Sequence, residues 1–278
     1  MLKKIIILFL LITPVTLSQI TFQKTYGGID YEEANAVVQT SDDGFIVVGY
    51  TETFGAGNRD FYVVKTQPDG DTIWTKTFGG VNYDQAHCIT KADGSNYIIG
   101  GYTSSFGVEG DIYLIKIDEN GDAIWTKTIG TEDNDHISKI RKTSDGGFII
   151  CGDIERWGQY KYYIVKTDSN CDTVWTKAYD YGIANSLIQT DDGGYAVIVY
   201  PYTSTISQHD FQLVKLNQFG EIMWSKFYGG LDPDIEIGYA LEQTTDNGYL
   251  LAGRADGYGS GASDFLIIKF IKEPPITK

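Results

Sequence analysis

The sequence IWTKTFGG, at Ile73 to Gly80, occurs in close or loose form five times along the chain. The other copies are IWTKTIGT at 124–131, VWTKAYDY at 174–181, MWSKFYGG at 223–230 and the looser TFQKTYGG at 21–28. The tryptophans of four copies, Trp74, Trp125, Trp175 and Trp224, are separated by 51, 50 and 49 residues. A regular period of this length indicates a repeat architecture and lies in the range of propeller blades.

Each period contains four strand signals separated by turn residues. In the first period they are Ala34–Thr40, Phe45–Gly49, Asp60–Lys65 and the quoted motif. Asp-Gly and Asn-Gly pairs stand between neighbouring strands, and these pairs favour tight hairpins. The second and third strands are apolar on successive residues, so both of their faces must be buried. This pattern favours packed four-stranded antiparallel blades over a sandwich whose sheets each have one solvent-exposed face.

The two ends of the repeat region complement each other. The chain shows a fourth-strand sequence at residues 20–26, before any complete unit, and it shows a third strand at 264–271 with no fourth strand after it. We therefore predict an all-β, five-bladed β-propeller over residues 19–271, closed by the N-terminal strand, with residues 272–278 as a tail. Closure of this kind would cover the free edge of the last sheet.

The first 18 residues have the pattern of a secretory signal peptide. Lys3 and Lys4 precede the apolar run Ile5–Ile12, and small residues at Thr16 and Ser18 favour cleavage after Ser18. The apolar run is shorter than the ~20 residues that span a bilayer. We expect a secreted protein, extracellular or periplasmic, with no membrane span.

Charge and cysteine content limit the possible partners and cofactors. The formal net charge is −15, which disfavours nucleic acid as a partner because the phosphate backbone is repelled. Three widely spaced cysteines form neither a disulfide framework nor a metal motif. Cys88 and Cys151 lie in apolar strand patterns, whereas Cys171 replaces a turn glycine and is expected to be exposed.

The repeat also resembles known propellers. The stretch DIYLIKIDENGDAIWTKT, at 111–128, is distantly similar to the PQQ-like propeller superfamily. The full unit more closely resembles secreted bacterial and archaeal propeller repeats that read W-x-K-x-x-GG, T-x-DGG-[FY] and D-x-Y-[LIV]-[IV]-K. The resemblance implies a fold and export but no particular activity, and it does not imply the PQQ cofactor.

Acidic residues recur two positions before the first strand of the repeat. Four of the five units carry one: Glu32, Asp84, Asp135 and Glu236. One interpretation is that each caps backbone N–H groups of the adjacent strand or blade, as Asp does in many turns. The other is a cation site, because Ca²⁺ takes several carboxylate oxygens. No EF-hand spacing is present, and no other cofactor is indicated.

The third unit departs most from the repeat and holds the candidate ligand-binding residues. These are Lys139 and Arg141 in its first strand, Arg156 and Trp157 in its long loop, and Lys161 at its third strand. They predict a site for an anion or an acidic sugar, with Trp157 as a stacking face. The competing interpretations are that nearby acids neutralise these cations, and that Trp157 belongs to a repeated packing column with Phe54, Phe106 and Tyr258.

Two functions remain open from the sequence. The first is a secreted binding or scaffold module for a protein or a glycan, since loops on a rigid scaffold commonly carry binding sites. The second is an extracellular glycoside hydrolase, which needs two carboxylates in distinct surroundings. We identify no catalytic residue, because the acids here recur with the repeat and the nucleophile and P-loop motifs are missing.

Overall fold

The computed structural model describes residues 22–201, 211–228, 236–256 and 263–271. The predicted signal peptide (1–18) and tail (272–278) lie outside the described residues. Nineteen strands are found in the described part, and the described residues contain no helix. The chain is therefore all-β there, as predicted.

The strands form five antiparallel sheets, which we call blades one to five. Blade one contains β1 (Glu32–Gln39), β2 (Phe45–Thr51), β3 (Asp60–Thr66) and β4 (Thr72–Phe78). Blade two contains β5 (Asp84–Lys91), β6 (Tyr97–Thr103), β7 (Asp111–Ile117) and β8 (Ala123–Ile129). Blade three contains β9 (Asn134–Lys142), β10 (Phe148–Arg156), β11 (Gln159–Thr167) and β12 (Thr173–Tyr179). Blade four contains β13 (Ile183–Gln189), β14 (Tyr195–Tyr200), β15 (Phe211–Leu216) and β16 (Ile222–Tyr228). Blade five contains β17 (Glu236–Gln243), β18 (Tyr249–Ala255) and β19 (Asp264–Phe270).

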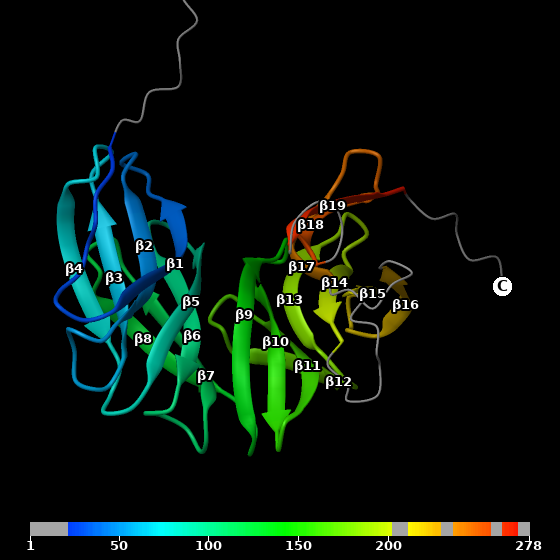
Figure 1. The fold of residues 1–278 in the computed structure, drawn as a ribbon, viewed down its shortest axis with the longest axis horizontal. Helices are drawn as coiled ribbons and strands as arrows, with labels where there is room; N and C mark the ends of the chain where they lie inside the picture. The colour runs from blue at the N-terminus through cyan, green and yellow to red at the C-terminus, as the bar shows by residue number, and fades with distance from the viewer. Residues whose placement is uncertain (1–21, 202–210, 229–235, 257–262, 272–278) are drawn as a thin grey trace, which may run out of the picture.

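The blades follow one another in a propeller-like array, as Figure 1 shows from blue to red. The first strand of each blade lies beside the first strand of the next. Each first strand also carries a β-bulge near its start, for example between Ala34 and Ala36 in blade one. The extra residue of two bulges reaches the neighbouring blade: Asn35 Nδ2 donates to the Ala86 carbonyl at 2.8 Å and Asn185 Nδ2 to the Gly238 carbonyl at 3.1 Å. The bulge therefore helps to hold successive blades together.

The core lies between the blades rather than within one of them. Four clusters of buried side chains each join two successive blades. Between blades one and two, Phe61 and Val63 of β3 face Tyr113 and Ile115 of β7, and the Phe61 and Tyr113 ring centroids are 5.5 Å apart. Middle strands such as β7 are buried along their whole length. This explains the continuous apolar runs in the sequence, because both faces of a middle strand contact another blade.

A repeated ion pair ties the turn between the first two strands to the third strand. The five lysines near the ends of third strands each contact an aspartate of that turn: Lys65–Asp42, Lys116–Asp93, Lys166–Asp145, Lys215–Asp192 and Lys269–Asp246. In blade three the Lys166 Nζ to Asp145 Oδ2 distance is 2.9 Å, and Lys166 is buried. Burial raises the pKa of Asp145, but hydrogen bonds from Thr143 and Lys166 outweigh it and hold the pKa at about 2. The T-x-DGG and K motifs of the repeat are therefore structural.

Cys171 differs from its prediction. It occupies the glycine position of a turn with a φ of 60°, yet it is only 2 % exposed and belongs to the core cluster between blades two and three. Its small apolar side chain fills space beneath the turn, as free cysteines commonly do.

The fourth strands form the outer edges of blades one to four and contact the next blade. Trp74 Nε1 donates to the Glu119 carbonyl at 3.2 Å, and Lys76 Nζ lies 2.8 Å from Asp122 Oδ1, both in the β7–β8 turn. Residues 22–28 contact blade one in the same manner. Lys24 binds Asp71, and Tyr26 Oη donates to the Gly70 carbonyl at 2.7 Å.

The predicted pairing of this segment with the last blade does not appear in the structure. Residues 22–28 are not assigned to a strand, and β19 pairs only with β18 among the described residues. In Figure 1 blade one lies at the left and blade five lies right of centre, and no described strand of one is beside a strand of the other. The array of blades is thus open, although the N-terminal segment already occupies the position of a preceding blade's fourth strand.

Candidate functional site at the long-loop ends of the blades

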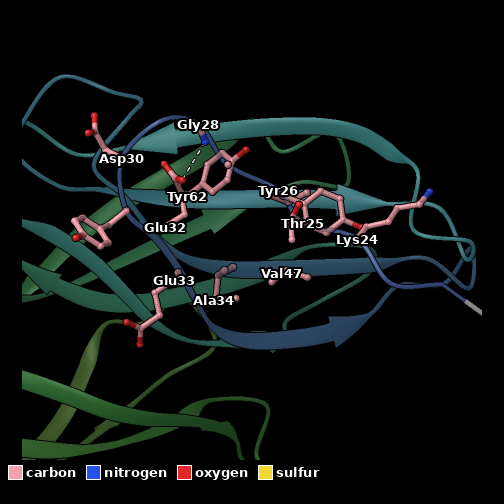
Figure 2. Close-up of a pocket in the computed structure, with 15 residues that line it drawn as sticks. Lys24, Thr25, Tyr26, Gly28, Asp30, Glu32, Glu33, Ala34, Val47 and Tyr62 are labelled. Atoms are coloured by element: carbon pink, nitrogen blue, oxygen red, sulfur yellow. Dashed lines mark hydrogen bonds between the residues drawn. The ribbon is translucent and has the colours of Figure 1, made fainter. Parts of the chain in front are cut away.

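Three of the recurring acids at the first strands, Glu32, Asp84 and Asp135, bind the loops next to their own strands. Asp84 Oδ2 accepts from the Gly80 N–H at 2.7 Å and from Ser105 Oγ at 2.6 Å, while Asp84 Oδ1 accepts from Thr103 Oγ1. Glu32 binds the Gly28 N–H in the same way, at 3.0 Å, as the dashed line in Figure 2 shows. These contacts fit the capping interpretation.

The four acids lie in four different blades. Asp84 and Asp135 are fully buried and Glu236 is 2 % exposed. Over the described ranges, no group of three or more His, Cys, Asp or Glu side chains is placed to hold a metal ion. The structure therefore does not gather Glu32, Asp84, Asp135 and Glu236 into one cation site.

Asp135 has an unusual environment among these acids. Its Oδ2 accepts from the Thr131 N–H at 2.6 Å, but its buried Oδ1 has no hydrogen-bond partner. A Cβ placed on Gly130 would lie 1.7 Å from Asp111 Oδ1 and 3.1 Å from Asp135 Oδ2, so the two carboxylates approach each other at this glycine. Burial raises the pKa of Asp135 to about 6; the charge of Asp111 adds to the rise, and hydrogen bonds from Thr131 oppose it.

The five candidate residues of blade three fall into two groups. Arg156, Trp157 and Lys161 lie at the long-loop end of the β10–β11 hairpin, whereas Lys139 and Arg141 lie further along β9, opposite Cys151 and Ile149 of β10. The cations have acidic neighbours: Arg156 Nε is 3.3 Å from Asp133, Lys161 is 4.0 Å from Asp180, and Arg141 is 3.6 Å from Glu242. The structure thus does not bring all five residues to a single anion site.

Trp157 does not belong to a packing column. Phe54 packs on Tyr62 and Phe106 packs on Tyr113, with ring centroids 5.7 Å and 5.1 Å apart. Trp157 instead stands 88 % exposed at the tip of the β10–β11 hairpin. The loop of blade three is shorter than those of blades one and two, so the aromatic side chain cannot fold back onto its own sheet. Tyr258, the fourth member of the predicted column, lies outside the described residues.

A polar network missed by the sequence analysis crosses the long-loop ends of blades one to three. We define the loop-end network as Glu33, Tyr50, Arg59, Gln85, Tyr102, His136 and Asp153. In blade one Tyr50 Oη donates to Glu33 Oε2 at 3.1 Å, and the Arg59 guanidinium lies 3.9 Å from the Tyr50 ring centroid. Arg59 Nη1 then donates to Gln85 Oε1 of blade two at 3.3 Å.

The network continues from blade two to blade three. The Tyr102 ring stacks on His136 with centroids 5.0 Å apart and an interplanar angle of 16°. His136 Nδ1 lies 3.1 Å from Asp153 Oδ2, and Asp153 is buried. Burial lowers the pKa of His136, but the hydrogen bond and charge of Asp153 outweigh it, so the pKa is raised. Asp153 therefore favours the protonated, charged form of the His136 ring.

The repeat itself contains the signal that identifies this network. Glu33, Gln85 and His136 occupy one first-strand position, opposite Tyr50, Tyr102 and Asp153 in the second strand. Blades four and five have Ile183 and Ile237 at that position. A repeat position that is polar in three blades and apolar in two is not explained by architecture alone.

Comparisons with known proteins show only a general likeness. No protein-family model matches the sequence, and no curated protein matches it. Among solved structures, an endo-arabinase from Bacteroides thetaiotaomicron has a TM-score of 0.48 at 10 % identity, covering 84 % of this chain and 91 % of that one. A putative exo-β-1,3-galactanase from Bifidobacterium bifidum has a TM-score of 0.48 at 11 % identity (86 % and 87 % covered), and the Dos1 propeller has 0.48 at 11 % (88 % and 71 % covered). At these values the likeness carries no information about activity.

Among the described residues, none forms a helix long and apolar enough to cross a membrane.

Proposed function

We propose that the protein is an exported propeller-type binding module that engages a glycan or protein ligand through the loop-end network. The observation that supports this proposal is the loop-end network itself, which the described residues place across blades one to three. The repeated residues are already used in ion pairs, caps and inter-blade packing. The network adds two carboxylates, a guanidinium, an amide and an imidazole to two tyrosine rings on a rigid scaffold, which is a composition suited to ligand binding.

The alternative, a glycoside hydrolase, has less support from the geometry. A carboxylic acid with a raised pKa, such as Asp135, is typical of a hydrolase general acid. Asp135 is fully buried, however, and so is Asp84 at the matching position of blade two. A substrate bond cannot reach a carboxylate that is covered by its own loops.

Binding of the full secreted chain to a glycan array and to extracellular-matrix proteins tests the proposal. The double substitution Arg59→Gln and His136→Gln should weaken binding of any captured ligand at least 10-fold, because both side chains lie partly exposed in the network. Lys177→Gln, on the exposed outer strand β12, is the matched control and should bind like the unmodified protein. Equal binding by the double variant, or turnover of chromogenic glycosides by the unmodified chain, would contradict the proposal.

We also infer that the open array closes into a five-bladed ring, with β19 pairing beside residues 20–26. A pocket of about 560 Å³ lies between the N-terminal segment and blade one, and Val47, Tyr62 and Val64 contribute to its wall (Figure 2). Tyr62 and Val64 correspond in the repeat to Tyr113 and Ile115, which pack against Phe61 and Val63 of the preceding blade. The pocket thus corresponds to the space that a preceding blade fills elsewhere.

Blade five has the matching surface. Phe265 and Ile267 of β19 are 99 % and 70 % exposed, whereas their repeat equivalents, Phe61 and Val63, are completely buried. Closure would bury them, so Phe265→Ser should then cost about 3 kcal/mol of unfolding free energy. In an open array the same change would stay within about 0.5 kcal/mol. Urea unfolding distinguishes these two results, with Phe219→Ser at an exposed turn as the control.

A further inference from the structure

The β10–β11 hairpin turns in only two residues, Trp157 and Gly158, because Arg156 pairs directly with Gln159. Their φ angles are 52° and 76°. Two successive positive φ angles define a type I′ turn, which strongly prefers Asn-Gly. A bulky L-residue in this region is a genuine outlier and costs roughly 1–2 kcal/mol.

The fold gains little from a tryptophan at this position. Trp157 is 88 % exposed, and its described ring contact is the Arg156 guanidinium, 4.5 Å from the ring centroid. An asparagine would satisfy the turn with less strain and would expose no apolar ring. A strained, exposed aromatic residue on a rigid two-stranded support suggests a role in binding.

The hairpin tip is connected to the loop-end network. Glu155 Oε1 accepts from the Gly158 N–H at 2.6 Å, and Glu155 Oε2 accepts from Asn134 Nδ2 at 3.3 Å. Asn134 and Glu155 are strand partners, two register positions from the His136–Asp153 pair and on the same face of the sheet. The hairpin tip therefore continues the surface of the loop-end network at blade three.

The charges around the tip do not form an anion site. The cations Arg156 and Lys161 face Asp133 and Asp180, and the Glu155 carboxylate adds a further negative charge. An acidic ligand would have to displace these carboxylates. Uncharged hydroxyl groups, by contrast, can donate to the carboxylates and accept from Arg156 and Lys161 without disrupting either pair.

We propose that Trp157 is the stacking platform for a neutral oligosaccharide, which deepens the proposed binding function by naming its ligand class. Arg156 covers one face of the indole, so one sugar ring stacks on the opposite face through its apolar C–H groups. Hydroxyl groups at the edge of the sugar bind Glu155, which projects from the opposite face of the hairpin to Arg156 and Lys161. A protein partner fits less well, since a specific protein interface covers about 800 Å² on each side and this tip presents one ring above a charged surface.

Titration of the full secreted chain with neutral and acidic oligosaccharides tests this proposal. The neutral probes are cellohexaose, xylohexaose, maltohexaose and arabinohexaose, and the acidic probe is hexagalacturonate, followed by calorimetry and by tryptophan fluorescence. Trp157→Asn should reduce affinity for the bound neutral sugar at least 10-fold while leaving the melting temperature equal or higher, because asparagine suits the turn. Trp157→Tyr, which keeps an aromatic face, should retain most of the affinity.

The outcomes separate the two proposals. Unchanged sugar binding by Trp157→Asn, or binding of the acidic probe alone, overturns the platform and leaves the binding module in place. Loss of self-association in Trp157→Asn, with no sugar bound, would assign the tip to an interface between copies and also overturns it. If none of the probes binds at millimolar concentration, the neutral-sugar assignment is rejected. The proposed binding function is then tested separately, by the glycan-array and protein screen with the double variant at Arg59 and His136.

Discussion

Blade two joins its second and third strands through a loop, Ser104–Gly110, whereas blade three joins them through the two-residue turn at Trp157. The loop of blade two packs Phe106 on its own sheet, and the turn of blade three projects Trp157 into solvent. The two blades are alike in their outer strands, in their Lys–Asp pairs and in their bulges. Variation is thus concentrated at the long-loop ends, where a repeat can change without loosening its neighbours.

The same end shows a second difference between the blades. Asp84 of blade two stands opposite Thr103, which binds it, whereas Asp135 of blade three stands opposite Ile154. The missing hydroxyl leaves Asp135 Oδ1 without a partner. Blade three thus keeps an unsatisfied carboxylate close to its exposed aromatic tip, which is the kind of local conflict expected near a functional site.

The largest effect we predict concerns a feature that both blades share. Trp125 of blade two and Trp175 of blade three are partly buried and pack on the cores between their blade and the next. Trp125→Ala and Trp175→Ala should each lower the unfolding free energy by about 3 kcal/mol, because each leaves a cavity at an inter-blade contact. Urea unfolding measures both. A difference of more than about 1 kcal/mol between them would show that the outer strands are not equivalent.

The second prediction removes the feature that distinguishes blade two. Thr103 Oγ1 donates to Asp84 and accepts from the N–H groups of Ser105 and Phe106, each at 3.1 Å. Thr103→Val keeps the shape of the side chain but deprives a buried carboxylate of a hydrogen bond, so it should cost about 2 kcal/mol. Thermal and urea unfolding provide the measurement, with Thr128→Val on the exposed outer strand β8 as a control. Equal stability of the two variants would mean that the Asp84 cap contributes nothing.

Most of the fold could be predicted from the repeat. The 50-residue period, the turn glycines and the apolar middle strands predict five successive sheets, and all five second strands begin at the predicted residue. The third strand of blade three begins two residues earlier than predicted, at Gln159, because its hairpin turn is short. These sequence features are local or occur in all five repeat units, so each unit supports the interpretation of the others. The closure by residues 20–26 depends on contacts between the two ends of the chain, and it stays a prediction.

The site was less predictable for a physical reason. Arg156, Trp157 and Lys161 were selected because they break the repeat, but the length of their loop decides that they stand at a hairpin tip. The link from Tyr102 to His136 joins different blades, so no spacing within one unit indicates it. The polar position shared by Glu33, Gln85 and His136 is the one signal of the network that an alignment of the five units contains.

The smallest effect we predict would make blade three resemble blade two. Ile154→Thr places a hydroxyl opposite Asp135, at the register position that Thr103 occupies opposite Asp84. Ile154→Val is the matched control, because valine has the shape of threonine without the hydroxyl. Both changes remove some buried apolar volume, so each should cost about 1 kcal/mol when Asp135 is protonated.

The pH dependence of this pair of variants provides the decisive measurement. The pKa of Asp135 is raised to about 6 in the folded protein from an ordinary value of 3.8, so the native state loses stability as pH rises between these values. A hydroxyl that binds the ionised carboxylate offsets part of this loss. Threonine should therefore be about 1 kcal/mol more stable than valine at pH 8 and equal to it near pH 4, where Asp135 is protonated in the folded protein of both variants. If the stabilities of the two variants differ by the same amount at both pH values, the unsatisfied oxygen of Asp135 does not cause that difference. The only contrast left between the two blades is then the shape of their loops.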